Sequence, residues 1–219
     1  MSLALTNPRG ARVQSPNLSA HLQRDQYGDF RLTDAVRPSV DLQIVPRQGY
    51  RVQTIREGKM VARMVAASVS REVLFDTFLA MLKLLSPVVD VVLESSHEAK
   101  DEEDFKDLWR EGIDLPVLMS YLCEHEELLM NDGCTGLAVL NPKRTAEVVW
   151  DEHKLLFVHA PKLQRFRRVL EEMGVRRDDE MRFITEAEHL HSTHPRFKNE
   201  FEQLCMHVGV GQSVEHVNW

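Results

Sequence analysis

The feature that most constrains the fold of this chain is residues 70–97, its longest apolar passage. Residues 70–85 are apolar apart from one narrow polar stripe at helical spacing, which predicts a helix covered on most sides. Ser70 is the expected N-cap, and Pro87 ends the helix because proline disfavours helical backbone at the preceding residue. Residues 88–93, VVDVVL, are β-branched and nearly continuous, which is typical of a buried strand. We therefore expect this helix and strand to form the centre of the core.

Alternating side chains and turn residues predict further strands. Residues 50–57 and 60–68 lie on either side of Gly58-Lys59, and their alternation predicts a β-hairpin. Residues 181–184 are expected to form one short strand. Three short runs later in the chain are joined by brief turns, which implies an antiparallel meander over residues 136–140, 145–150 and 154–159.

Periodic apolar residues predict helices over residues 115–130 and 161–173 and a last helix after Pro195. Gly133 is expected to take the left-handed conformation that ends many helices. A capping-box pattern at residues 185–188 predicts one more short helix. The complete pattern predicts an α+β fold, in which a mixed, largely antiparallel sheet of about six strands packs against four or five helices.

The two ends of the chain differ from its middle. Residues 1–46 contain four prolines and few apolar clusters, so we expect an extended, partly flexible N-terminal arm. Residues 47–209 are expected to form a single α+β domain, and residues 210–219 a loose C-terminal tail. An arm of this kind makes a homodimer plausible, because it can reach a second copy of the chain.

Composition excludes several classes of partner. A formal net charge of −7 and a pI near 5.8 argue against a broad surface for nucleic acid or anionic membrane. Residues 73–85 are too few to span a bilayer, and the first residues lack the apolar run of a secretory signal. Three widely spaced cysteines suggest reduced thiols. We expect a cytoplasmic protein that has no membrane partner and does not bind nucleic acid.

Charge is unevenly distributed along the chain. Residues 94–114 carry nine acidic and three basic residues, a local charge of −6, and their large apolar side chains recur at helical spacing, which predicts an acidic surface helix. Residues 161–177 form the most basic stretch. This opposition favours a cytoplasmic interaction or regulatory protein without catalytic activity, which uses the acidic segment (94–114) and the basic helix (161–177) to contact a protein partner.

His189, His191 and His194 form the pattern H-x-H-x-x-H and are candidate metal ligands. In an extended stretch His189 and His191 share a face, whereas on a helix His191 and His194 do. A polar, solvated turn before Pro195 explains the pattern without a metal. On these grounds we predict neither a metal ion nor any other cofactor.

Glu94 and His97 are candidate catalytic residues, because they follow the most buried strand and ligands often gather at strand ends. A polar loop that enters the acidic segment is the favoured explanation, because the chain contains no G-x-S-x-G motif and residues adjacent in sequence rarely form a triad. Cys134 is a candidate nucleophile just after an expected helix end. Asp90 interrupts an apolar strand, so its carboxylate must be paired or have a shifted pKa.

Residues 115–184 have the element order of the core of restriction-endonuclease-like nucleases, and TAEVVWDEHKLLFVHAPK resembles the strand pair that carries their acidic and E-x-K residues. That resemblance implies Mg²⁺ held by acidic groups. Here residues 159–161, His-Ala-Pro, replace the end of the signature, and Glu152-His153-Lys154 matches it only within a turn. The alternative function is therefore a metal-dependent hydrolase, or a degenerate relative of these nucleases, that uses residues 189–194 or acids near Glu94 and Glu147.

Overall fold

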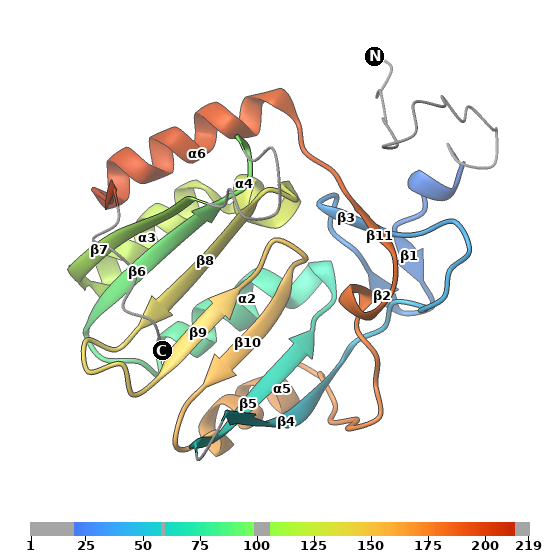
Figure 1. Ribbon diagram of the computed structural model, residues 1–219, viewed down its shortest axis with the longest axis horizontal. Helices are drawn as coiled ribbons and strands as arrows, with labels where there is room; N and C mark the ends of the chain where they lie inside the picture. The colour runs from blue at the N-terminus through green and yellow to red at the C-terminus, as the bar shows by residue number, and fades with distance from the viewer. Residues whose placement is uncertain (1–19, 58–59, 99–105, 213–219) are drawn as a thin grey trace.

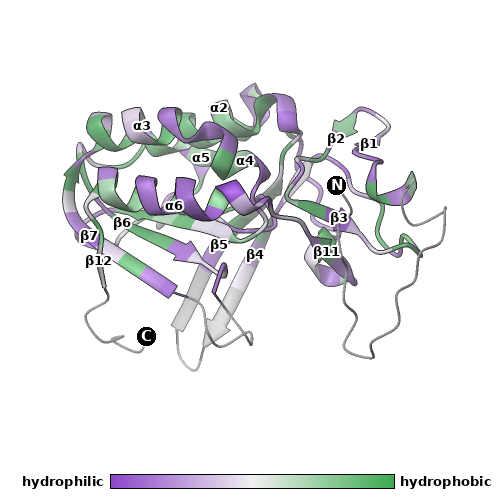
Figure 2. Ribbon diagram, turned by 90° about the horizontal axis from the view of Figure 1, so that it is seen from above, coloured by the Kyte–Doolittle hydropathy of each residue, from purple (hydrophilic) through white to green (hydrophobic). Residues whose placement is uncertain are grey.

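The computed structural model describes residues 20–57, 60–98 and 106–212. Its main body is one antiparallel sheet of eight strands in the order β12-β7-β6-β8-β9-β10-β5-β4. The large helices lie together on one face of this sheet (Figures 1 and 2). The predicted α+β fold is confirmed, and the large sheet is antiparallel throughout.

The strands of the large sheet are β4 (Gly49–Glu57), β5 (Met60–Ser68), β6 (Val88–Ser95), β7 (Lys106–Asp114), β8 (Thr135–Leu140), β9 (Glu147–Trp150), β10 (Leu155–His159) and β12 (Gly211–Gln212). Two small sheets pair β1 (Gln26–Tyr27) with β2 (Phe30–Arg31) and β3 (Val36–Pro38) with β11 (His189–His191). The helices are α2 (Arg71–Leu82), α3 (Leu115–Glu124), α4 (Glu126–Asn131), α5 (Gln164–Glu172), α6 (Pro195–Val208) and the 3-10 turn η1 (Ile184–Glu186).

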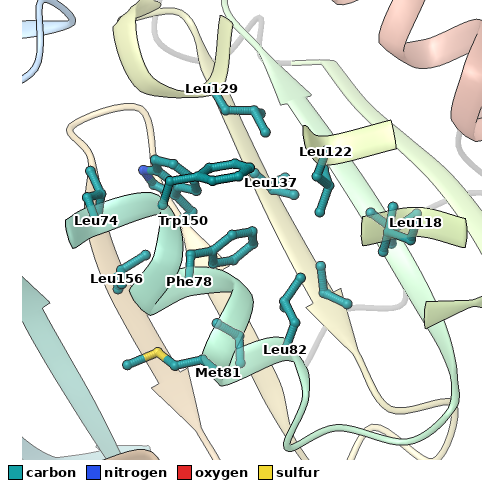
Figure 3. Close-up of a cluster of buried hydrophobic side chains, with 14 of the residues drawn as sticks. Leu74, Phe78, Met81, Leu82, Leu118, Leu122, Leu129, Leu137, Trp150 and Leu156 are labelled. Carbon is teal, nitrogen blue, oxygen red and sulfur yellow. The ribbon is translucent and has the colours of Figure 1, made fainter. Parts of the chain in front are cut away.

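The expected centre of the core is present as α2 and β6. Figure 3 shows Phe78 and Leu82 of α2 among buried side chains of the sheet, and the Phe78 ring centroid lies 4.9 Å from that of Trp150 on β9. The helix ends at Leu82, well before Pro87. Ser70 precedes α2 but does not cap it, because its hydroxyl accepts from the Arg31 N–H at 3.0 Å and donates to Glu72.

The β-hairpin and the antiparallel meander are confirmed as β4–β5 and β8–β9–β10. The predicted acidic helix is wrong where the structure describes it, because residues 106–114 form strand β7 beside β6. Strand pairing with the buried β6 overrides the apparent helical spacing. Residues 99–105 of that segment lie outside the described residues.

Four further expectations are corrected. The predicted helix over residues 115–130 breaks at His125 into α3 and α4. Gly133 does not have the positive φ expected of it, whereas Gly209 does end α6 in the left-handed conformation, at φ 72°. The chain near residue 184 forms η1 instead of a strand, and β11 replaces the short helix expected after residue 188, because this strand pairs with β3.

The described part of the expected N-terminal arm, residues 20–46, holds strands β1 to β3. Its apolar residues form a small cluster with Ile184 that is separate from the main core, namely Tyr27, Phe30, Leu32 and Val36. Residues 1–19 and 213–219 lie outside the described residues. Among the helices that the structure describes, none has both the length and the apolar character needed to cross a membrane.

Candidate metal centre

Polar side chains from distant parts of the sequence meet at one end of the large sheet. Strand β6 ends here, strand β8 begins here, and β9 turns into β10 here, because the pairs β6–β8, β8–β9 and β9–β10 are all antiparallel. Strand β11 runs past the same end (Figure 1). Its position is fixed by a contact of 2.7 Å between His191 Nδ1 and the carbonyl oxygen of Gly133, just before β8.

Three histidines form a cluster at this end of the sheet. His153 lies in the β9–β10 turn, and His189 and His191 occupy alternate positions of β11, so they share one face of the strand. The ring centroids are 4.6–5.1 Å apart. One ligand nitrogen from each histidine lies within 4.8 Å of the other two. We call these three residues the trihistidine cluster.

The three imidazoles of the trihistidine cluster share one hydrogen-bonding feature. The Nδ1 atom of every ring faces an acceptor oxygen, with distances of 2.9 Å from His153 to Asp151 Oδ2, 2.8 Å from His189 to Ala187 O and 2.7 Å from His191 to Gly133 O. A carbonyl or carboxylate oxygen only accepts, so Nδ1 is the donor in each contact, and in a neutral ring this leaves the lone pair on Nε2. Histidines that bind metals show this same arrangement, with the non-ligating nitrogen held by a carboxylate or a carbonyl.

The backbone around Gly133 leaves no room for a side chain. Its N–H donates to the Ser192 carbonyl at 2.8 Å, and the Ser192 N–H donates to the Ala35 carbonyl at 2.8 Å. A Cβ at Gly133 would lie 2.8 Å from the Ser192 oxygen and closer still to the Ala35 oxygen. Glycine is therefore required by this close approach, and not by the helix cap that the sequence suggested.

An acidic cavity adjoins the trihistidine cluster. It has a volume of about 140 Å³ and is lined by Glu94, Cys134, Gly136, Asp151, Glu152 and His153. Burial raises the pKa of Glu94 to about 7, and the surrounding carboxylates add to this shift. Burial likewise raises the pKa of Glu152. Gly136 makes space for Glu94 on the neighbouring strand, because a Cβ there would lie 3.0 Å from Glu94 Oε2.

A second group of possible ligands lies beside this cavity: His97, Asp132 and Cys134, whose ligand atoms are within 4.8 Å of one another. Asp132 is fully buried and accepts from the hydroxyls of Thr135 and Thr193 at 2.5 and 2.6 Å. Burial by itself raises the pKa of Asp132, but these donors and His97 outweigh it and hold that pKa below its usual value.

The histidine pattern seen in the sequence is divided by the structure. His189 and His191 enter the trihistidine cluster. His194 does not, because it precedes α6 and its Nδ1 accepts from the Arg196 N–H at 3.2 Å. The third member is instead His153, which is 36 residues before His189 in the chain.

The other candidates also separate into two groups. Glu94 and Cys134 both line the cavity, and His97 lies next to it. Asp90 has a structural role: its carboxylate accepts from the Gly112 N–H at 2.9 Å, where β7 carries a bulge. Gly112 has φ 67°, which suits a glycine at such a bulge.

Sequence reasoning missed His153, Asp151, Glu152 and Asp132. The first three were interpreted as the turn of a meander, which they are. The available signal was D-x-H, in which a carboxylate two residues away orients an imidazole. The E-x-K resemblance gains no support here, because the Lys154 amine is buried and donates to the Thr135 carbonyl at 2.8 Å, and Lys154 is not among the residues that line the cavity.

Searches of protein-family models, of curated proteins and of solved structures found no match for this chain. The chemistry of the site is therefore derived from its own geometry.

Proposed function

We propose that the protein is a metal-dependent hydrolase whose metal ion binds to Nε2 of His153, His189 and His191. The observation that carries this proposal is the shared orientation of the three imidazoles. Each Nδ1 is already held by an oxygen acceptor, so a lone pair on each Nε2 is available for an ion. A solvated polar turn does not require three imidazoles to share this arrangement.

The donor set favours Zn²⁺. Neutral imidazoles suit Zn²⁺ and similar transition ions, whereas Mg²⁺ and Ca²⁺ prefer oxygen ligands. Three protein ligands leave a fourth position for water, and Zn²⁺ lowers the pKa of such a water to about 7. At Zn–N distances of about 2.0–2.1 Å, tetrahedral ligand nitrogens stand roughly 3.4 Å apart. One ring nitrogen from each histidine lies within 4.8 Å of the other two, so binding an ion would bring the rings closer together.

The adjoining cavity supports hydrolysis as the reaction. His153 is part of its wall, so a water bound to the ion would face the cavity carboxylates. Glu94 is our candidate for the general base that removes a proton from this water. The carboxylates on the wall repel anions, which favours a neutral or cationic ester or amide over a phosphodiester.

Calorimetric titration of the metal-free protein with Zn²⁺ tests the metal site. We expect His189→Gln and His191→Gln to weaken binding by at least about 10- to 100-fold, because each removes one ligand. His194→Asn is the matched control, since it removes a neighbouring histidine and retains a side chain that caps α6. Unchanged Zn²⁺ affinity in both glutamine variants would overturn the proposal.

Activity is measured with the Zn²⁺-loaded protein on a neutral ester, p-nitrophenyl acetate, and on the phosphodiester bis-p-nitrophenyl phosphate. We expect turnover of the ester to exceed that of the phosphodiester, and Glu94→Gln to lower ester turnover by about 100-fold or more. Ester hydrolysis that is equal with and without Zn²⁺ would contradict a hydrolytic role for the ion.

The non-catalytic interaction function inferred from charge stays a prediction. In the described part of the acidic segment, Glu98 is already paired with Lys106 and with Lys198, the latter at 2.9 Å. Exposed pairs of this kind contribute little stability and can be exchanged for a partner's charges. A strictly monomeric protein that captures nothing through residues 94–114 would dispose of this alternative.

A further inference from the structure

In the second ligand group, His97, Asp132 and Cys134, one buried ring nitrogen lacks a hydrogen bond. His97 Nε2 lies 2.9 Å from Asp132 Oδ2, yet it is buried and makes no hydrogen bond within the described residues. At this distance, failure to form a hydrogen bond means that the N–H direction misses the oxygen. The Asp132 carboxylate offsets part of the cost of burying this nitrogen, but the hydrogen-bonding capacity of the nitrogen stays unused.

A bound ion would remove this cost. In a tetrahedral site with bonds of about 2.0–2.3 Å to nitrogen, oxygen and sulfur, ligand atoms stand roughly 3.3–3.7 Å apart and point at the ion, not at each other. His97, Asp132 and Cys134 offer one nitrogen, one oxygen and one sulfur within 4.8 Å. The 2.9 Å between His97 Nε2 and Asp132 Oδ2 is shorter than this spacing, so a bound ion would move these two atoms slightly apart.

The rest of the network holds these ligands in place. The Thr135 and Thr193 hydroxyls orient the Asp132 carboxylate, and the His97 ring centroid lies 6.1 Å from that of Phe201 on α6. The Ser96 N–H donates to the Cys134 carbonyl at 2.9 Å, which ties the end of β6 to the start of β8. The site is thus covered by α6 on one side and reaches the cavity through Cys134 on the other.

A cysteine nucleophile activated by His97 and Asp132 fits these residues less well. Burial raises the pKa of Cys134, and the negative charges of Asp132 and Glu152 add to this shift, so the thiol stays protonated in the metal-free protein. Nucleophilic cysteines instead lie beside positive charge. A divalent ion would supply that charge and take the thiolate as its ligand.

We propose that His97, Asp132 and Cys134 bind a second divalent ion of the borderline class, Zn²⁺, next to the cavity. This inference goes beyond the proposed hydrolase function and does not depend on it. The two sites share a wall, because residues 132–134 supply two ligands to one and the Gly133 carbonyl supports His191 in the other. The cavity that both sites adjoin is also lined by Glu152, whose carboxylate accepts from Ser96 Oγ at 3.4 Å and is a candidate for the open coordination position.

The experiment measures Zn²⁺ stoichiometry and the absorption spectrum of the Co²⁺-substituted protein. We expect two equivalents of Zn²⁺ per chain, and a near-ultraviolet thiolate-to-Co²⁺ charge-transfer band. Cys134→Ser should reduce binding from two equivalents to one and abolish the band. Cys205→Ser is the matched control, because it removes another partly buried thiol, on α6, that is not in the ligand group.

The two proposals fail in different ways. His189→Gln should also leave one equivalent but retain the thiolate band, and His97→Gln should weaken the band while circular dichroism shows an unchanged fold. A wild-type protein without the band, or a band that persists in Cys134→Ser, overturns the second site alone. Stoichiometry that His189→Gln does not reduce overturns the trihistidine site alone.

Discussion

The two faces of β6 have opposite characters, although they belong to one strand. Val89, Val91 and Leu93 point under the helices and are fully buried in the main core. Asp90, Val92 and Glu94 point to the other face. Asp90 accepts from the Gly112 N–H at the bulge in β7, Val92 joins a small apolar cluster, and Glu94 lines the acidic cavity. Successive side chains of a strand point to opposite faces, so core residues and titratable residues can be neighbours in the sequence.

This contrast extends across the sheet. On the helix-covered face, large apolar side chains determine the fold, and their contribution depends on volume and shape. On the opposite face and at the end of the sheet, titratable groups are partly buried beside one another, an arrangement that stability alone does not favour. The predictions below separate these two regions by the size and the sign of their effects.

The largest effect is expected on the helix-covered face. Phe78→Ala should lower the free energy of unfolding by about 3–5 kcal/mol, because it leaves a cavity against Trp150 and the rest of the core. Chemical denaturation with circular dichroism measures this change. A loss below about 1 kcal/mol would show that the helix-covered face tolerates cavities, and the two faces of the sheet would then not differ as described.

An intermediate loss is expected at Asp132, where the two regions meet. Asp132→Ala should destabilise the metal-free protein by about 2–3 kcal/mol, since it leaves two threonine hydroxyls without their acceptor. Asp132→Asn is the control, because its amide oxygen still accepts one of these bonds, so it should cost less. Equal losses in both variants would mean that the contribution of Asp132 to stability does not come from its hydrogen bonds to the threonines.

The opposite sign is expected at Glu94. Its pKa of about 7 exceeds its ordinary value of 4.5, so the folded protein binds more protons than the unfolded chain between these values. Stability of the metal-free protein should therefore fall as pH rises from about 4.5 to 7. Glu94→Gln should stabilise it by roughly 2 kcal/mol at pH 8, allowing for partial solvent access, and by little at pH 5. A difference between wild type and variant that does not change with pH would contradict this interpretation.

The smallest effect is expected at Asp90. Asp90→Asn keeps an oxygen that accepts from the Gly112 N–H, so the free energy of unfolding should change by less than about 1 kcal/mol. Zn²⁺ binding should not change at all, because Asp90 is not in either ligand group. A variant that loses Zn²⁺ would show that Asp90 contributes to the site.

The sequence predicted what depends on local periodicity and short connections. Helix α2, strand β6, the hairpin and the meander follow from patterns within a few tens of residues. It failed where pairing over a long distance decides the structure, as for β7 and β11, since their partners are chosen by the fold. The site shows the same limit. Glu94 and His97 were found from a strand end and Cys134 from an expected helix end, but joining His153 to His189 and His191 requires the registers of three strand pairs.

The most direct test of the central claim is anomalous X-ray diffraction at the zinc edge from crystals of the Zn²⁺-loaded protein. We predict an anomalous peak about 2.0–2.1 Å from Nε2 of His153, His189 and His191. Data from His194→Asn should show the same peak, and data from His189→Gln should not. A map with no peak at the trihistidine cluster, or with Zn²⁺ only at His125 and His207, whose ring nitrogens lie 3.1 Å apart, would contradict the account.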